Sequence, residues 1–576
     1  TMQAVFNFRN EYPAVTADMA IDLLDLQALK FMDTELKFTG DVYADVLSTN
    51  PNYPNGLLSV RSPFLTSNGK TYMFDSVYIN STPEDSIQHI DVNVANIVNA
   101  KLTGKIPLLQ MGNALLAHVN QYYTLSDTVS NAPLAYDMNL SGTLAYHRLF
   151  RQVVPELRPF DTVRFYSIIN PGALNIGITA PRIRYGTMSL DTFSFSAIEQ
   201  DRSLVYVAGL NRFAQGSIQF YNSSLSGYLR NDSIASFLNL TDREGVDQFG
   251  LGVVTAITPQ NDIVLQLQRG LKLNYDDWAV DPNNSIVLGG PKGLFIRNLS
   301  LTQGDQLISA NSRDTSYNSP LHVDIRNFSL LNLTKMISKD TILADGRLFV
   351  NGDLDMRDSF PRITSNIRID SLYVMGSDLG DLGAEVHNEN AYSYSANATL
   401  KGHGNDLSIV GTYFMKPVNN NELDFKATFN AFSLKSIEGL TFGNLRNSSG
   451  VLRGDLDIKG TVASPSISGQ LKTDSLKTTL AMFNTYMSMP SETIRFNEGK
   501  GLYFDRFKIY DQYGKLATLT GSLNTKNFTE YTLDMTLKAN EWQAMNSTSK
   551  DNESIYVKMF ISADLALHGN MTAPAI

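Results

Sequence analysis

The sequence predicts a mostly β protein. We expect a long, curled antiparallel β-sheet (a β-taco or U-shaped trough) built from repeats of about 105 residues, with a few short amphipathic helices on its apolar face. Three observations lead to this prediction: a composition typical of strands and turns, long segments in which apolar and polar residues alternate, and blocks that recur at a fixed spacing.

The composition favours an extended β architecture. Only 18% of the 576 residues are charged and 10% are aromatic, and the chain has 39 Gly, 26 Tyr and 30 Phe. Aromatic residues favour strands, and Gly favours the turns between them. A chain of this length must form several domains, one very large sheet or a repeat array.

Alternation is clearest in the last third of the chain, in segments 423–430, 533–540 and 557–568. The last of these keeps the pattern for about twelve residues, which is roughly 40 Å of strand. Strands with one polar face are typical of antiparallel sheets, because parallel sheets are usually covered on both faces.

Two segments, 106–122 and 144–157, instead have apolar residues at helical spacing. The first has Leu108, Leu109, Leu115, Leu116, Val119 and Tyr122, and the second has Leu149, Phe150, Val153, Val154 and Leu157. Pro155 would kink or end the second helix. We expect both helices on the apolar face of the sheet, where they either fill a core or gate access to it.

Blocks recur at an offset of 104 residues. Segments 321–330 and 425–434 are each predicted to end a strand at an Asn with an aromatic nearby, and each is followed by a strand that begins with Gly346 or Gly450. Segment 535–544 resembles them, and another copy begins at 563. The predicted division is 1–105 (N-terminal β-repeat), 106–160 (helix-containing), 161–320 (β-repeat region), 321–440 and 441–545 (β-repeats), and 546–576 (the start of another repeat).

Several classes of function are disfavoured. A net charge of −10 without clusters of Lys and Arg argues against nucleic-acid binding, and a chain without Cys has no disulfide or thiolate site. The seven His are scattered, and we expect them at the surface. Asp353, Asp355, Asp455 and Asp457 fit the solvent face of strands rather than an acid–base pair. We therefore expect no catalytic residue, no metal ligand, no cofactor and no enzymatic activity.

Eight Asp-Ser/Thr-aliphatic tripeptides resemble the O-glycosylation sequon of Bacteroidetes envelope proteins. The alternative is that Asp-Ser/Thr simply opens a strand. Sugar would be attached at Ser76, Ser86, Thr128, Thr162, Ser233, Thr341, Ser371 and Ser475.

Segment 454–471, with Gly454, Gly460, Pro465, Ile467 and Gly469, resembles the TamB (translocation and assembly module) family of AsmA-like envelope proteins in its Bacteroidetes form, as do segments 26–29 and 273–286. The resemblance implies a periplasmic β-taco with an apolar lumen. It also implies an inner-membrane helix before it and, after it, a C-terminal domain that engages an Omp85-family (TamA-like) outer-membrane barrel. We expect both of those parts to lie outside this sequence, with the full protein anchored in the inner membrane and spanning the cell envelope. The departure at Met356 leaves the register of the first copy open.

The leading hypothesis is that the apolar groove carries phospholipid between the inner and outer membranes. Alternatives are an assembly factor for outer-membrane proteins that acts with the Omp85-family barrel, and a β-sandwich adhesin or glycan-binding array. The residues expected to contact acyl chains are Phe425, Ala427, Phe429, Leu456, Ile458, Met535, Leu537, Met559, Ile561, Leu565 and Leu567.

Overall fold

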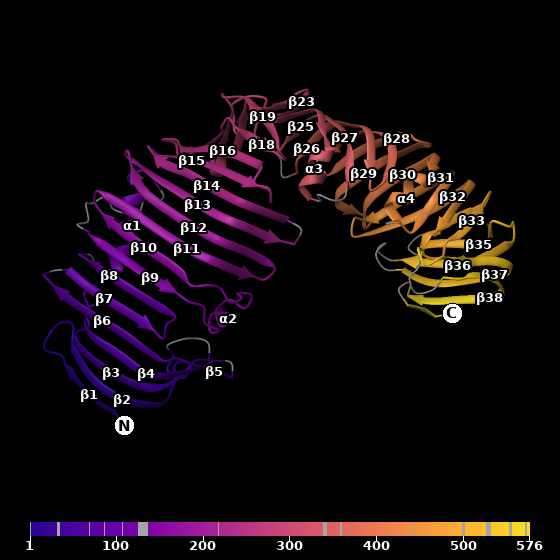
Figure 1. Ribbon diagram of the computed structural model, residues 1–576. Helices are drawn as coiled ribbons and strands as arrows, with labels where there is room; N and C mark the ends of the chain where they lie inside the picture. Colours follow the sequence, from indigo (N-terminus) through magenta and orange to yellow (C-terminus); the bar gives the residue numbers. More distant parts are fainter. Residues whose placement is uncertain are drawn as a thin grey trace. The chain divides into compact units, whose positions relative to one another are not determined.

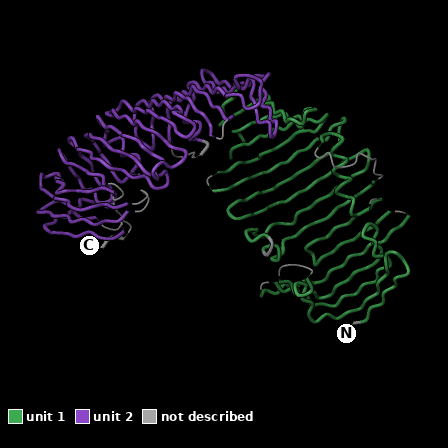
Figure 2. Tube along the Cα trace, turned by 180° about the vertical axis from the view of Figure 1, so that it is seen from behind, with its two compact units in different colours: residues 1–278 green, residues 279–576 purple. Residues whose placement is uncertain are grey.

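The computed structural model describes residues 2–30, 35–67, 69–85, 87–105, 107–124, 136–216, 218–337, 342–357, 360–441, 443–497, 501–525, 531–551, 556–570 and 573–575. The protein is mostly β, with 70% of residues in strands and 6% in helices, and its described strand pairs are antiparallel, as predicted. Two compact units divide the chain, Thr1–Trp278 (unit 1) and Ala279–Ile576 (unit 2) (Figure 2).

In unit 1 the strands lie side by side, and most pair with the strands before and after them in the sequence (Figure 1). The strands are β1 (Met2–Asn7), β2 (Ala14–Asp25), β3 (Lys37–Ser48), β4 (Asn55–Ser67), β5 (Lys70–Met73), β6 (Ser76–Glu84), β7 (Ile87–Val94), β8 (Val98–Gly104), β9 (Met138–Leu144), β10 (Val163–Asn170), β11 (Ala173–Tyr185), β12 (Met188–Gln200), β13 (Ser203–Gln215), β14 (Ile218–Arg230), β15 (Ser233–Thr241), β16 (Asp247–Ile257), β17 (Ile263–Leu267) and β18 (Leu271–Leu273). The helices are η1 (Leu108–Gln110), α1 (Met111–Val119) and α2 (Phe150–Val153).

Unit 2 has the same organisation. Its strands are β20 (Ser285–Leu288), β21 (Leu294–Arg297), β22 (Leu299–Gln303), β23 (Gln306–Ser312), β24 (Leu321–Ser329), β25 (Ala344–Asp355), β26 (Arg362–Val374), β27 (Ser377–Asn390), β28 (Ser393–Gly402), β29 (Asn405–Val418), β30 (Asn421–Ser433), β31 (Leu445–Thr461), β32 (Ser464–Leu480), β33 (Thr485–Met489), β34 (Thr493–Asn497), β35 (Gly501–Tyr510), β36 (Leu516–Thr525), β37 (Tyr531–Asn546), β38 (Lys558–Asn570) and β39 (Ala573–Ala575), and β19 (Asp276–Val280) spans the division between the units. The helices are η2 (Gly290–Lys292), α3 (Leu330–Ile337), α4 (Leu434–Glu438), η3 (Gly439–Thr441) and η4 (Ala481–Phe483).

The repeat is visible in the strand register. Val350 of β25 pairs with Ile367 of β26, and Gly454 of β31 pairs with Leu471 of β32, so equivalent positions 104 residues apart are paired in the same way. The change at Met356 therefore leaves the register of the first copy intact. Its effect is local: β25 ends at Asp355, whereas β31 continues to Thr461.

The prediction that the repeated Asn residues end strands is wrong. Asn327, Asn430 and Asn540 all lie inside strands, at points where the pairing register shifts. Asn327 has a φ of 51°, a left-handed conformation that Asn adopts more readily than most residues. These are β-bulges, which bend a strand and increase its twist.

The two predicted helices are present only in part. The stripe in 106–122 forms η1 and α1, but in 144–157 only Phe150–Val153 is helical. Phe150 stacks against Phe160, with ring centroids 6.0 Å apart, so this segment packs in a local aromatic cluster. Two further helices, α3 and α4, begin at Leu330 and Leu434, equivalent points of the repeat that the sequence analysis had assigned to strand ends.

Candidate functional site

One face of unit 2 has an unbroken row of apolar residues that runs across the strands in register. Directly paired positions connect β22 to β38, bypassing only β33. This row, called row 2, is Leu301, Ile308, Ile325, Val350, Ile367, Ala384, Ala398, Ile409, Ala427, Leu456, Gly469, Phe496, Leu502, Leu523, Leu533 and Gly569. At ~4.8 Å per strand, the row is on the order of 70 Å long when followed from strand to strand.

Unit 1 has an equivalent row that connects β2 to β16 and bypasses only β5. Row 1 is Ala17, Ala44, Leu58, Ile79, Val92, Ala100, Gly142, Phe165, Ile178, Phe195, Ala208, Leu225, Leu238 and Leu251. Neither row contains a charged residue or a side chain that forms hydrogen bonds. Each unit therefore presents a continuous apolar path at right angles to its strands.

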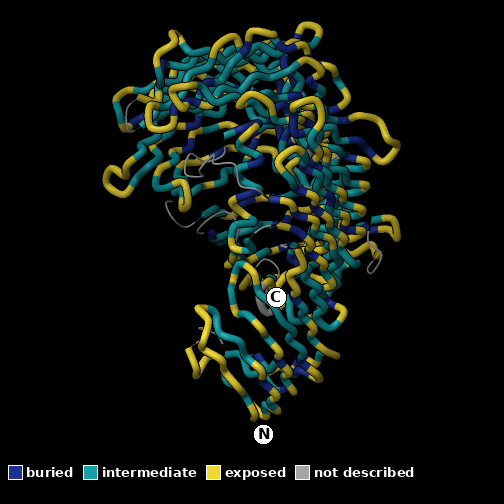
Figure 3. The backbone as a smooth tube through the Cα atoms, turned by 90° about the vertical axis from the view of Figure 1, so that its left-hand side faces the viewer, coloured by how far each residue is buried: buried dark blue, intermediate teal, exposed yellow. Residues whose placement is uncertain are grey.

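Most residues of both rows are half-buried, as are most strand residues in Figure 3. Ile367 and Ile409 belong to this class, and Leu225 and Leu251 at the far end of row 1 are each 38% exposed. Two sheets packed face to face would bury such side chains almost completely. The apolar face is thus only partly covered by the protein itself.

In unit 2 the opposite face is mostly polar and carries ion pairs between neighbouring strands. Lys538 Nζ lies 3.2 Å from Asp564 Oδ2, and Arg495 Nη1 lies 3.5 Å from Asp505 Oδ2. Exposed pairs of this kind contribute little to stability, but their charged side chains keep this face of the sheet in contact with solvent. Unit 2 therefore has one polar and one apolar face, whereas in unit 1 the face opposite row 1 also exposes apolar side chains such as Val207 and Phe237, each 43% exposed.

Short helices cover parts of the apolar face. In unit 1, Ala114 of α1 packs with Leu102, Met138 and Ile169 of three strands. In unit 2, Leu434 of α4 packs with Ala427, Leu452 and Leu456. These contacts place α1 and α4 on the same face as rows 1 and 2, the location expected for the first predicted helix.

The eleven residues expected to contact acyl chains all occupy one parity of their strands. Ala427 and Leu456 belong to row 2, and the others lie on the same face at other positions along their strands. Phe425 pairs with Ile458, Met535 with Leu567, and Leu537 with Leu565. Phe429 packs in the cluster of Ala427 and Leu456, Ile561 packs against Trp542, and Met559 is 39% exposed.

A buried polar cluster that the sequence did not predict lies between α1 and the sheet. His118 was expected at the surface and instead is fully buried. Its Nδ1 lies 2.8 Å from the Tyr136 hydroxyl, and its Nε2 lies 3.7 Å from Oε2 of Glu199 on β12. Burial lowers the pKa of His118, and the Glu199 carboxylate offsets only part of that effect. Burial and the hydrogen bond with Glu199 raise the pKa of Tyr122.

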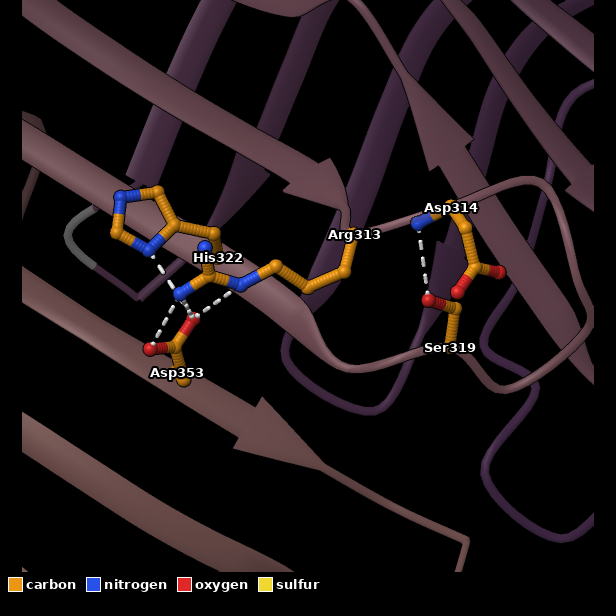
Figure 4. A network of polar contacts seen from close by, with 5 residues as sticks. All are labelled: Arg313, Asp314, Ser319, His322 and Asp353. Carbon is orange, nitrogen blue, oxygen red and sulfur yellow. Dashed lines mark hydrogen bonds and ion pairs between the residues drawn. The ribbon is translucent and has the colours of Figure 1, made fainter.

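A second polar network lies on the polar face of unit 2 (Figure 4). Arg313 donates from Nη2 to both Asp353 oxygens at 2.7 and 2.8 Å, and His322 Nδ1 lies 3.1 Å from Asp353 Oδ1. Burial alone would raise the pKa of Asp353, but the hydrogen bonds from Arg313 and His322 outweigh it and lower that pKa. The network joins neighbouring strands, so we assign it a structural role.

The possible glycosylation sites fall into two structural groups. Asp75 and Asp232 directly precede the first residues of strands, Ser76 and Ser233, and Thr162 directly precedes β10, which agrees with the strand-opening alternative. Ser371 and Ser475 do not open strands: they are exposed, lie inside β26 and β32, and have φ values of 54° and 55°. Ser86, Thr128 and Thr341 lie outside the described residues.

Comparisons of the chain with protein-family models, curated proteins and solved structures found no match. Across the described part of the chain, no helix is both long and apolar enough to cross a membrane. Nor do three or more His, Asp or Glu side chains come together there in an arrangement that could hold a metal ion.

Proposed function

We propose that this chain is the periplasmic segment of a TamB-like bridge that carries phospholipid between the inner and outer membranes, with the acyl chains on rows 1 and 2. One observation carries the proposal: each unit has an unbroken, in-register apolar path that the protein leaves partly uncovered. Contiguous exposed apolar surface of more than a few hundred Å² is unusual in a monomer and marks a binding surface.

The energetics suit acyl chains. Each methylene group removed from water contributes about 0.8 kcal/mol, so a chain that lies along several strands gains several kcal/mol without any specific contact. Lipid could also slide, because successive positions such as Ile367, Ala384 and Ala398 are chemically alike. A headgroup would remain in water beyond the ends of the strands.

The alternative of a closed β-sandwich is less well supported. A sandwich buries the inner faces of its two sheets against each other, whereas Leu225 and Leu251 in row 1 are 38% exposed. Assembly of outer-membrane proteins remains compatible with lipid carriage, because strand pairing would use the edges of a sheet rather than its apolar face.

The test compares two neighbouring residues of β29. Ile409 is half-buried in row 2, whereas Val410, on the opposite face, is 50% exposed. An Ile409→Asp variant places a charge in the apolar path, and Val410→Asp adds the same charge to the polar face. The readout is the amount of phospholipid extracted per protein, measured by mass spectrometry after purification without detergent.

We expect Ile409→Asp to lower the lipid content severalfold while Val410→Asp leaves it unchanged, with far-UV circular dichroism showing that both variants are folded. Wild-type protein without bound phospholipid would contradict the proposal. So would a folded Ile409→Asp variant that retains the wild-type lipid content.

A further inference from the structure

A cationic pocket lies at the margin of the unit 1 sheet, where α2 and β5 come together (Figure 1). It has a volume of about 490 Å³ and is lined by Lys70, Thr71, Tyr72, Arg148, Arg151 and Pro155. Three of these six residues carry a positive charge, in a chain whose net charge is −10. A local excess of this sign attracts anions.

One arginine that lines this pocket, Arg148, is held in place by β5. Arg148 donates from Nη2 to the Thr71 carbonyl oxygen at 3.1 Å, and its guanidinium lies 5.3 Å from the centre of the Tyr72 ring. Tyr72 itself is 3% exposed, so the ring is a fixed support. A guanidinium held in this way loses little conformational freedom when it binds an oxyanion.

The cations have no acidic partner in the described residues. None of Lys70, Arg148 and Arg151 forms an ion pair there with a carboxylate. Glu156 follows Pro155 in the chain, but its carboxylate lies against Gly186, where a Cβ would be 2.7 Å from Oε2. The three positive charges are therefore available to a ligand, and phosphate oxygens are strong hydrogen-bond acceptors for Arg and Lys.

The pocket is also close to the apolar face. Leu144, the last residue of β9, pairs with Val98 and Val163 in an apolar line that flanks row 1. Arg148 follows four residues later, so its Cα lies within about 14 Å of that of Leu144. A phospholipid with its acyl chains on the apolar face can therefore reach the pocket with its phosphate.

We propose that this pocket binds the phosphate of a phospholipid headgroup at the margin of the unit 1 sheet. The proposal rests on the function proposed above and adds to it a site for the headgroup. Lys70, Arg148 and Arg151 provide the charge, Thr71 and Tyr72 hold Arg148 in position, and the diester oxygens accept the hydrogen bonds. A free phosphate ion has the same chemistry, so the test must separate the two sources.

The experiment is calorimetric titration of the full chain, depleted of lipid, with three soluble probes: dihexanoylphosphatidylglycerol, dihexanoylglycerol and inorganic phosphate. The variant is Lys70→Gln with Arg151→Gln, which removes two charges and leaves Arg148 and its contacts in place. The matched control is Arg230→Gln, an exposed arginine at the end of β14 outside the pocket.

We expect the double variant to weaken binding of dihexanoylphosphatidylglycerol roughly tenfold, because each hydrogen bond to a charged group is strong. The double variant should bind dihexanoylglycerol, which has no phosphate, as the wild type does. The Arg230→Gln variant should bind dihexanoylphosphatidylglycerol with the wild-type affinity. Inorganic phosphate should bind the wild type much more weakly than the phospholipid does, because it gains nothing from the apolar face.

Unchanged phospholipid binding by the double variant would overturn the headgroup site. Inorganic phosphate that binds as tightly as the phospholipid would overturn it too, and would identify a site for free phosphate. Either result leaves the lipid content of the Ile409→Asp variant as an independent test of acyl-chain binding. Failure of the headgroup site and failure of the proposed function are therefore distinguishable.

Discussion

His118 is the most unusual single residue of the apolar face, because an imidazole is buried there beside a carboxylate. It connects α1 to the sheet through Tyr136 and Glu199. A buried imidazole is most stable when neutral, so protonation must either disturb these contacts or move the ring toward Glu199. We therefore expect the docking of α1 to depend on pH.

We expect the free energy of unfolding of the wild type to fall as the pH is lowered, and titration of His118 to cause part of this loss. The folded-state pKa of His118 is lowered from its ordinary value of 6.5, so the unfolded chain binds the proton first. The stabilisation is therefore complete above about pH 6.5 and is lost as the pH falls through the lower folded-state pKa. The measurement is the urea midpoint between pH 8 and pH 5 for the wild type and for His118→Gln, which cannot titrate.

The wild type should lose stability relative to His118→Gln as the solution is acidified. Because the carboxylates away from this cluster are the same in both proteins, the difference between the two curves isolates His118 and its contact with Glu199. Parallel curves would show that the imidazole does not control the docking of α1.

At the residue scale, the sequence predicted features that depend on a local pattern but not contacts between residues that are distant in the chain. Alternation identified the face of Phe425, Ile458 and Leu565, because side chains in a strand point to opposite sides in turn. His118 and Glu199 are 81 residues apart in the sequence, and only the packing of α1 against β12 brings them together. No spacing rule could have paired them.

β-Bulges bend the strands at equivalent positions of the repeat. In the second copy, Gly450 faces Ser475 across the β31–β32 pair; its φ is 88° and a Cβ would lie 2.4 Å from the Ser475 carbonyl oxygen. Gly346 and Ser371 occupy the equivalent positions in the first copy. Gly346 and Gly450 combine a positive φ with a close approach of the next strand, and a residue with a Cβ would be strained there.

We expect Gly450→Ala to destabilise unit 2 by about 1–3 kcal/mol, because the new methyl group must displace a backbone carbonyl. Gly514 is the matched control: its φ is 74°, but nothing lies within 4 Å of its Cβ position. Gly514→Ala should therefore cost only the backbone strain, about 1 kcal/mol. Urea unfolding of both variants measures the difference, and equal losses would mean that the close approach at Gly450 is unimportant.

At the element scale, the strands were easier to predict than the short helices. Long alternating strands such as β37 and β38 can be predicted from the sequence, because apolar and polar residues alternate in them over about a dozen residues. The helices α3 and α4 span only 8 and 5 residues, and their leucines directly continue a strand. The bulges were invisible for a related reason: an inserted residue changes the register without changing the composition.

On the scale of the whole molecule, the central feature is the in-register alignment of apolar positions over each unit. Alternation within single strands requires only that one face be apolar. Rows 1 and 2 require in addition that every hairpin hold its register, because a slip by one residue would bring a polar side chain into the row. The sequence suggested the apolar face, but the rows themselves depend on pairings that only the structure provides.

The most direct test of acyl-chain binding is photo-crosslinking at adjacent residues of one strand. A photoreactive amino acid is placed at Ile409 in row 2, or at Val410 on the polar face, in protein made in cells, and adducts are identified by mass spectrometry. We expect phospholipid acyl-chain adducts at position 409 and at least tenfold fewer at position 410. Equal labelling of the two positions, or no lipid adduct at position 409, would contradict it.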